Sequence, residues 1–149
     1  MSAAPKHFLL ADDDEDDRLL FQYAVENIKL PVQITTASDG EQLMKYLSQA
    51  KNKLPDALFL DLNMPRKNGF TCLKEIKSSK SLSDIPVIIF STSYEPRFAE
   101  LLYEQGAHYY IAKPAGFDGL KEVIHRIFTI LKKTKIRPPK KDFLIKNPE

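Results

Sequence analysis

The sequence predicts an α/β fold in which helices cover both faces of a doubly wound, five-stranded parallel sheet. Short apolar segments alternate along the chain with segments whose apolar residues recur at helical spacing, an arrangement typical of parallel sheets. Three apolar segments lack polar alternation, as expected of strands buried on both faces: 8–11, 57–60 and 87–90. Those at 32–37 and 109–112 are more polar or amphipathic and suit the sheet edges. A strand order of 2-1-3-4-5 satisfies both observations.

Five helices are expected between and after these strands. Asp14 to Asp17 suit the start of the first helix, because acidic side chains there interact favourably with the free N–H groups and the helix dipole. Ser38-Asp39-Gly40 predicts the start of the second helix, and Gly106 predicts the end of the fourth. Apolar residues at helical spacing place the helices over 18–25, 43–47, 70–77, 96–105 and 117–131.

The length of 149 residues suits one domain, which we assign to residues 6–133. We expect residues 134–149 to form an irregular tail, because Pro138-Pro139 argues against a helix. This part of the chain is basic: residues 132–149 hold seven Lys or Arg and two acids, a net of +5. About eighteen residues are too few to fold alone. We therefore expect no direct binding of nucleic acid.

Several other classes of protein are disfavoured. No apolar run is long enough for a membrane span, and the N-terminus lacks the layout of a signal peptide. The one cysteine, Cys72, cannot form an internal disulfide and falls in a helical pattern, so we interpret it as a buried packing residue. His7, His108 and His125 are scattered without ligand spacing, and we assign them no function. The protein is predicted to be cytoplasmic and without membrane contacts.

Polar residues follow four of the predicted strands at the point where each strand ends. Because the carboxyl ends of parallel strands meet at one edge of the sheet, we expect these side chains to converge. Crowded carboxylates repel one another unless a cation intervenes, and Mg²⁺ prefers such oxygen ligands. A lysine and a hydroxyl beside them suit the oxygens of a phosphoryl group. The residues are Asp12 and Asp13, Asp61, Ser91 or Thr92, and Lys113.

These residues and their spacing resemble the receiver domain of bacterial two-component response regulators, in particular the stand-alone, CheY-like members. The resemblance spans residues 6–133 and implies a flavodoxin-like fold. It implies a signalling protein that accepts a phosphoryl group and assists its own phosphorylation and dephosphorylation, and is otherwise not an enzyme. The matching positions are Asp12-Asp13, Asp61, Asn63, Met64, Pro65, Gly69, Ser91, Tyr110 and Lys113-Pro114.

The resemblance implies that Asp61 receives the phosphoryl group from a histidine kinase or a phosphotransfer protein. Mg²⁺ would be the cofactor. Asp13 would bind it directly and Asp12 mainly through water, together with Asp61 and the backbone carbonyl of Asn63. Lys113 would pair with the phosphoryl group.

The resemblance also implies a switch and an output surface. Ser91 would hydrogen-bond the phosphoryl group, and Tyr110 would change between exposed and buried positions in response. The surface altered would be the face formed by residues 96–131, which would dock an unidentified downstream protein or form a homodimer. The sequence departs from the family pattern at Thr92, where a small residue is usual, and we expect Thr92 to affect phosphoryl turnover.

Two further expectations concern the turn after the fifth strand and a different function. The bond between Lys113 and Pro114 is expected to be cis, since a turn must direct the lysine back over the site.

The alternative function is a phosphatase of the haloacid-dehalogenase type, in which Asp12 and Asp14 would form the nucleophile motif. That chemistry also needs an acidic metal pair after a later strand, and no such pair follows Lys113.

Overall fold

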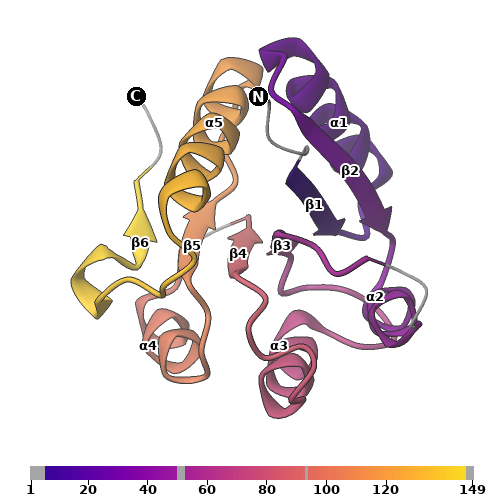
Figure 1. Ribbon diagram of the computed structural model, residues 1–149, viewed down its shortest axis with the longest axis vertical. Coiled ribbons are helices and arrows are strands. Elements are labelled where there is room, and N and C mark those ends of the chain that lie inside the picture. Colours follow the sequence, from indigo (N-terminus) through magenta and orange to yellow (C-terminus); the bar gives the residue numbers. More distant parts are fainter. Residues whose placement is uncertain (1–5, 50–52, 93, 147–149) are drawn as a thin grey trace.

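The computed structural model describes residues 6–49, 53–92 and 94–146, which form one six-stranded sheet with helices on both faces (Figure 1). Neighbouring strands are all parallel, in the order β2-β1-β3-β4-β5-β6. The strands are β1 (Lys6–Ala11), β2 (Val32–Ala37), β3 (Ala57–Leu60), β4 (Val87–Ser91), β5 (Tyr109–Ala112) and β6 (Leu144–Ile145). The helices are α1 (Glu15–Ile28), α2 (Gly40–Ser48), α3 (Gly69–Ser78), α4 (Pro96–Glu104) and α5 (Phe117–Lys133). The α/β class and the order of the first five strands are as predicted.

Two hydrophobic cores hold the strands in register, one on each face of the sheet. Helices α1 and α5 cover one face, and α2, α3 and α4 cover the other (Figure 1). Under α1 and α5 the rings of Phe8, Phe21, Phe59 and Phe90 pack together, with centroids of contacting rings 4.9 to 5.9 Å apart. The opposite core is built mainly from leucine and isoleucine. Because β1, β3 and β4 are buried on both sides, their carboxyl ends are firmly positioned.

Polar side chains cap the starts of helices α1, α2 and α3. The carboxylate of Asp14 accepts hydrogen bonds from two N–H groups in the first turn of α1, so the helix begins at Glu15, within the acidic run expected at its start. Asp39 caps α2 and Asn68 caps α3 in the same way. The loops after β1 and β3 are therefore anchored where the next helix begins.

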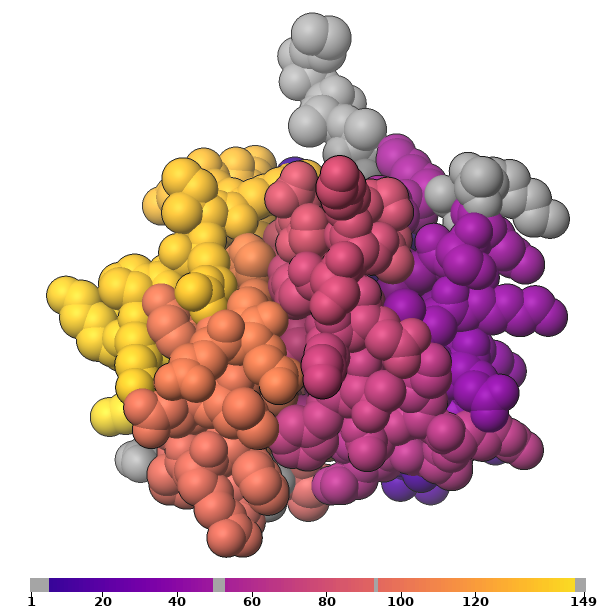
Figure 2. Space-filling model, turned by 90° about the horizontal axis from the view of Figure 1, so that it is seen from below, coloured from indigo at the N-terminus to yellow at the C-terminus, as the bar shows by residue number. Residues whose placement is uncertain are grey.

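The C-terminal segment, residues 134–146, differs from the irregular tail expected from the sequence. It contains a 3-10 turn at Lys140–Asp142, followed by β6, which pairs in parallel with β5. Phe143 and Ile145 are buried, at 4% and 3% exposure. The sheet thus has six strands, and β5 lies inside it rather than at its edge. Figure 2 shows this segment, in yellow, lying against the α4 region, in orange.

Candidate phosphoacceptor and metal site

Four of the predicted site residues lie at the carboxyl edge of the sheet. Asp12 follows β1, Asp61 follows β3, Ser91 is the last residue of β4, and Lys113 follows β5. The last residues of β1 and β3 are partners in the sheet, as are the last residues of β4 and β5. This register places the four side chains side by side, as the sequence predicts.

Three carboxylates form the centre of the site. Asp12, Asp13 and Asp61 each offer an oxygen atom, and these atoms all lie within 4.8 Å of one another. Asp12 is fully buried and Asp61 is 4% exposed, whereas Asp13 is open to solvent. Burial raises the pKa of both buried carboxyls above the ordinary value, although the neighbouring Lys113 partly opposes this. Three oxygen donors this close, with charge left uncompensated, fit a divalent cation.

Lys113 is the cation that the chain itself supplies to this cluster. Its Nζ atom lies 2.7 Å from Asp12 Oδ2, 2.9 Å from Asp17 Oδ2 and 3.4 Å from Asp61 Oδ2. Burial lowers the pKa of the ammonium, but the bonds to Asp12 and Asp17 and the charge of Asp61 outweigh this and raise it above its usual value. Lys113 is therefore a permanent positive charge beside Asp61.

Ser91, and not Thr92, is the hydroxyl residue that faces the site. Ser91 is 3% exposed, and its Oγ lies 3.5 Å from Asp61 Oδ1, at the outer limit of a hydrogen bond. Thr92 is exposed. Of the two hydroxyl residues that the sequence offered, Ser91 is therefore the one that lies beside Asp61.

Tyr110 is fully buried on β5 in this structure. Its ring packs against those of Tyr94 and Phe143, with centroids 5.0 Å and 6.2 Å away. Tyr110 and Ser91 are both among the residues that line a small pocket of about 120 Å³. The aromatic ring and the hydroxyl residue thus border the same space.

The expected cis bond before Pro114 is wrong. No cis peptide bond occurs among the described residues. The long side chain of Lys113 reaches all three carboxylates through a trans bond, while its backbone N–H donates to the carbonyl of Ser91 at 2.7 Å. The geometry therefore needs no reversal of the chain at this point.

Gly69 permits the close contact between α3 and the loop that carries Asp61. A Cβ atom at Gly69 would lie 2.3 Å from the backbone oxygen of Asp61, much closer than any side chain allows. The N–H of Gly69 donates to the carbonyl of Leu62 at 3.0 Å, and the N–H of Asn63 donates to Asp61 Oδ1 at 3.3 Å. The loop between β3 and α3 is thus bonded both to the start of α3 and to the Asp61 carboxylate.

Two residues that contact the site were not predicted from the sequence. Asp17 was interpreted only as part of a helix start, yet it forms an ion pair with Lys113. Phe143 belongs to the segment expected to be irregular, yet it packs on Tyr110. The unusual length of the acidic run, 12–17, is the feature of the sequence that points to Asp17. The sequence contains no comparable feature that points to Phe143.

Asp14 lies outside the carboxylate cluster. Its side chain accepts hydrogen bonds from the N–H groups of Asp16 and Asp17, at 2.9 and 3.2 Å. It therefore caps α1 and is not available as the second acid of a haloacid-dehalogenase motif beside Asp12. The phosphatase alternative has no support in this geometry.

Comparison with known proteins identifies this arrangement. The family model of the response regulator receiver domain matches residues 8–125. The chain belongs to this family. The Sensory transduction protein LytT of Oceanobacillus iheyensis is 33% identical over 141 residues, which cover 95% of this chain and 55% of LytT. The chain thus spans about half the length of that relative.

Solved receiver structures agree with the assignment to the family. The phosphorylated cyanobacterial phytochrome response regulator RcpA superposes with a TM-score of 0.80 at 34% identity, covering 91% of this chain and all of RcpA. The Mn²⁺-bound form of response regulator Rcp1 has a TM-score of 0.78 at 28% identity, covering 91% of this chain and all of Rcp1. In the part of the chain that the structure describes, no helix combines the length and hydrophobicity needed to cross a bilayer.

Proposed function

We propose that Asp61 is the residue of this receiver that accepts a phosphoryl group. The supporting observation is that one buried carboxylate lies between two further carboxylates and the ammonium of Lys113. In the transfer, an Asp61 oxygen attacks the phosphorus of a phosphohistidine, the P–N bond breaks, and the electron pair leaves with the imidazole nitrogen. Lys113 stabilises the negative charge on the phosphoryl oxygens as the new P–O bond forms.

The carboxylate cluster would hold Mg²⁺, which neutralises charge on the phosphoryl group when bound. Asp13 and Asp61 would bind it directly, Asp12 mainly through water, and Asn63 through its backbone carbonyl. Two properties of the site support this: the donors are all hard oxygen atoms, and two of the three carboxylates are buried, so that a cation bound between them would offset the cost of keeping them ionised. The Mn²⁺-bound relative Rcp1 is consistent with a divalent ion in this family.

The remaining residues of the site would set the lifetime of the phosphoryl group and transmit its presence to the protein surface. Ser91 would move toward the phosphoryl group, and the space beside it would let Tyr110 change its position. Exposed Thr92 would modulate loss of the phosphoryl group to water. The chain's own residues would thus assist both phosphorylation and dephosphorylation.

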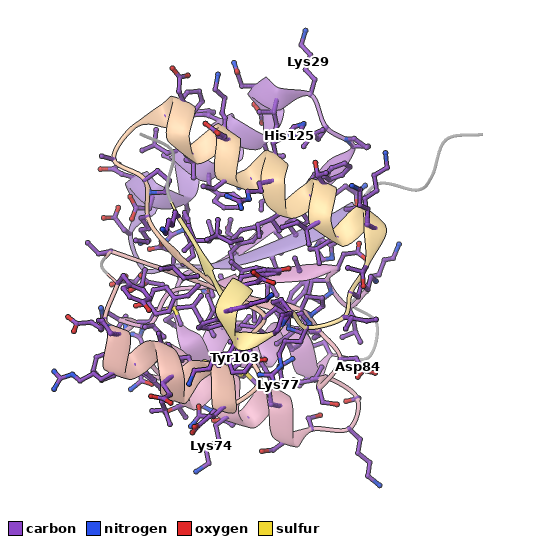
Figure 3. The ribbon with its side chains drawn as sticks, turned by 90° about the vertical axis from the view of Figure 1, so that its left-hand side faces the viewer. Lys29, Lys74, Lys77, Asp84, Tyr103 and His125 are labelled. Atoms are coloured by element: carbon purple, nitrogen blue, oxygen red, sulfur yellow. The ribbon has the colours of Figure 1, made fainter. Side chains whose placement is uncertain are left out.

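The output surface would be formed by residues 96–131 together with the C-terminal segment. Tyr103 of α4 donates from its hydroxyl to the carbonyl of Pro138 at 3.0 Å, and Lys140 forms an ion pair with Glu100 at 2.7 Å. Figure 3 shows Tyr103 beside the C-terminal segment. A downstream protein, or a second copy of the chain, would therefore meet α4 and this segment rather than an open β5 edge.

Two further proposals concern the setting of the protein. The kinase or phosphotransfer protein would supply the phosphoryl group in the cytoplasm, a reducing compartment that suits a chain whose single cysteine, Cys72, is a free thiol. Phosphotransfer from each histidine kinase of the same genome would identify the partner, and Asp61→Asn should abolish transfer from every one.

A small phosphodonor tests the proposal without a partner. After incubation with acetyl phosphate and Mg²⁺, the intact mass of the wild-type protein should increase by one phosphoryl group. Chelation of Mg²⁺ or the substitution Asp61→Asn should prevent the increase. Equal labelling of the wild type and the Asp61→Asn variant would contradict it.

A further inference from the structure

Among the described residues, Asp17 is the one carboxylate paired with Lys113 that lies outside the carboxylate cluster. Lys113 contacts three carboxylates, and its 2.9 Å contact with Asp17 Oδ2 is nearly as short as that with Asp12. The other two partners, Asp12 and Asp61, belong to the cluster that would hold a divalent ion, and Asp17 does not. Asp17 projects from the first turn of α1, and its side chain is 37% exposed.

A divalent cation and Lys113 compete for the same two carboxylates. When a metal draws charge from Asp12 and Asp61, the ammonium loses much of its attraction to them. Asp17 is then the carboxylate that can keep Lys113 in place at the rim of the site. We infer that Asp17 is a positioning residue, which draws Lys113 off the metal ligands and holds it where it can meet a phosphoryl oxygen. The second part of this inference rests on the proposed function of Asp61.

Removal of the Asp17 charge should therefore have two effects through Lys113. The ammonium would pair more closely with Asp12 and Asp61, so that Mg²⁺ would bind less tightly. It would also be less well anchored for transfer, so that phosphorylation at saturating Mg²⁺ would be slower. Because Asp17 is partly exposed, each effect should be modest, about two- to fivefold.

Asp16 provides a matched control for the change in charge. It precedes Asp17 in the same helical turn and is exposed. Within the described residues its carboxylate makes no ion pair or hydrogen bond. The variants Asp17→Asn and Asp16→Asn therefore change the net charge equally at nearly the same place, and only the first removes a contact with Lys113.

The experiment measures Mg²⁺ affinity by calorimetry and, separately, the phosphorylation rate with acetyl phosphate at saturating Mg²⁺. Asp17→Asn should weaken Mg²⁺ binding and slow phosphorylation about two- to fivefold relative to Asp16→Asn. In a Lys113→Ala background the two variants should be equal, since the proposed effect acts through the lysine.

Three results would overturn the inference: equal behaviour of the two variants in the wild-type background, tighter Mg²⁺ binding by Asp17→Asn, or a difference that persists without Lys113. The Mg²⁺ titration does not depend on phosphorylation. If the wild type took up no phosphoryl group, the proposed function would fail, and the titration would still decide the role of Asp17 toward the metal site.

Discussion

The ring of Phe143 lies edge-on to the ring of Tyr110, with centroids 6.2 Å apart and an angle of 88° between the ring planes. The backbones are joined at the same place, because the N–H of Tyr110 donates to the carbonyl of Phe143 at 2.9 Å. Tyr110 is the proposed switch residue, so the C-terminal segment contacts the switch directly. Any movement of Tyr110 toward solvent must displace or carry this segment.

The substitution Phe143→Ala should release the C-terminal segment from the sheet. Loss of a buried aromatic side chain usually costs about 3–5 kcal/mol, but local detachment of the segment should limit the loss here to about 2–3 kcal/mol. Urea unfolding would measure the free energy, and amide exchange in β5 should become faster. Ile136→Ala is the control, since Ile136 is 80% exposed and its truncation should be nearly neutral. Equal stability of the two variants would show that Phe143 does not anchor the segment.

The substitution Asp61→Asn should stabilise the metal-free protein. Burial raises the pKa of Asp61, so keeping this carboxyl ionised near pH 7 costs folding free energy. In the wild type, the folded state therefore binds a proton on the Asp61 carboxyl more tightly than the unfolded state does. Its contribution to stability is therefore present at low pH and lost as the pH rises through the folded pKa. Thermal unfolding without metal would test this.

Added Mg²⁺ should make the wild type more stable than the Asp61→Asn variant. A ligand that binds only the folded state stabilises it, and the wild type keeps all three carboxylates of the cluster. We expect the increase in Tm with Mg²⁺ to be clearly larger for the wild type than for Asp61→Asn. Equal increases would place the metal elsewhere.

His108 should make the protein sensitive to mild acid. Burial lowers its pKa to about 4, so the folded state binds this proton less readily than the unfolded state. Its contribution to stability is present above the ordinary value near 6.5 and is lost as the pH falls toward 4. The total loss is on the order of 3 kcal/mol. His108→Gln should flatten this part of the pH profile, whereas His125→Gln, at an exposed position, should leave it unchanged. A profile that keeps its slope in His108→Gln would exclude this role.

The sequence was sufficient to predict most of the fold and much of the site, for a physical reason. Strands buried on both faces must be apolar throughout, as in β1, β3 and β4, and polar residues at their ends stand out clearly. Since parallel strands align their carboxyl ends, the convergence of Asp12, Asp61, Ser91 and Lys113 follows from the order of the strands.

The features that escaped prediction depend on contacts between distant or very short segments. Strand β6 has only two residues, too few to give a periodic pattern, and it is held by the burial of Phe143 and Ile145. The pair between Asp17 and Lys113 joins residues 96 positions apart. The bond before Pro114 is trans, against the expectation, because the long side chain of Lys113 reaches the carboxylates without a cis turn.

The most direct test of the account is to locate the phosphoryl group on the chain. Borohydride reduces an aspartyl phosphate to homoserine, which marks the phosphorylated residue permanently. After phosphorylation with acetyl phosphate and Mg²⁺, reduction and digestion, peptide mass spectrometry should find homoserine at position 61. Homoserine at Asp12 or Asp13, with residue 61 unmodified, would contradict the assignment, and at Asp12 it would revive the phosphatase alternative.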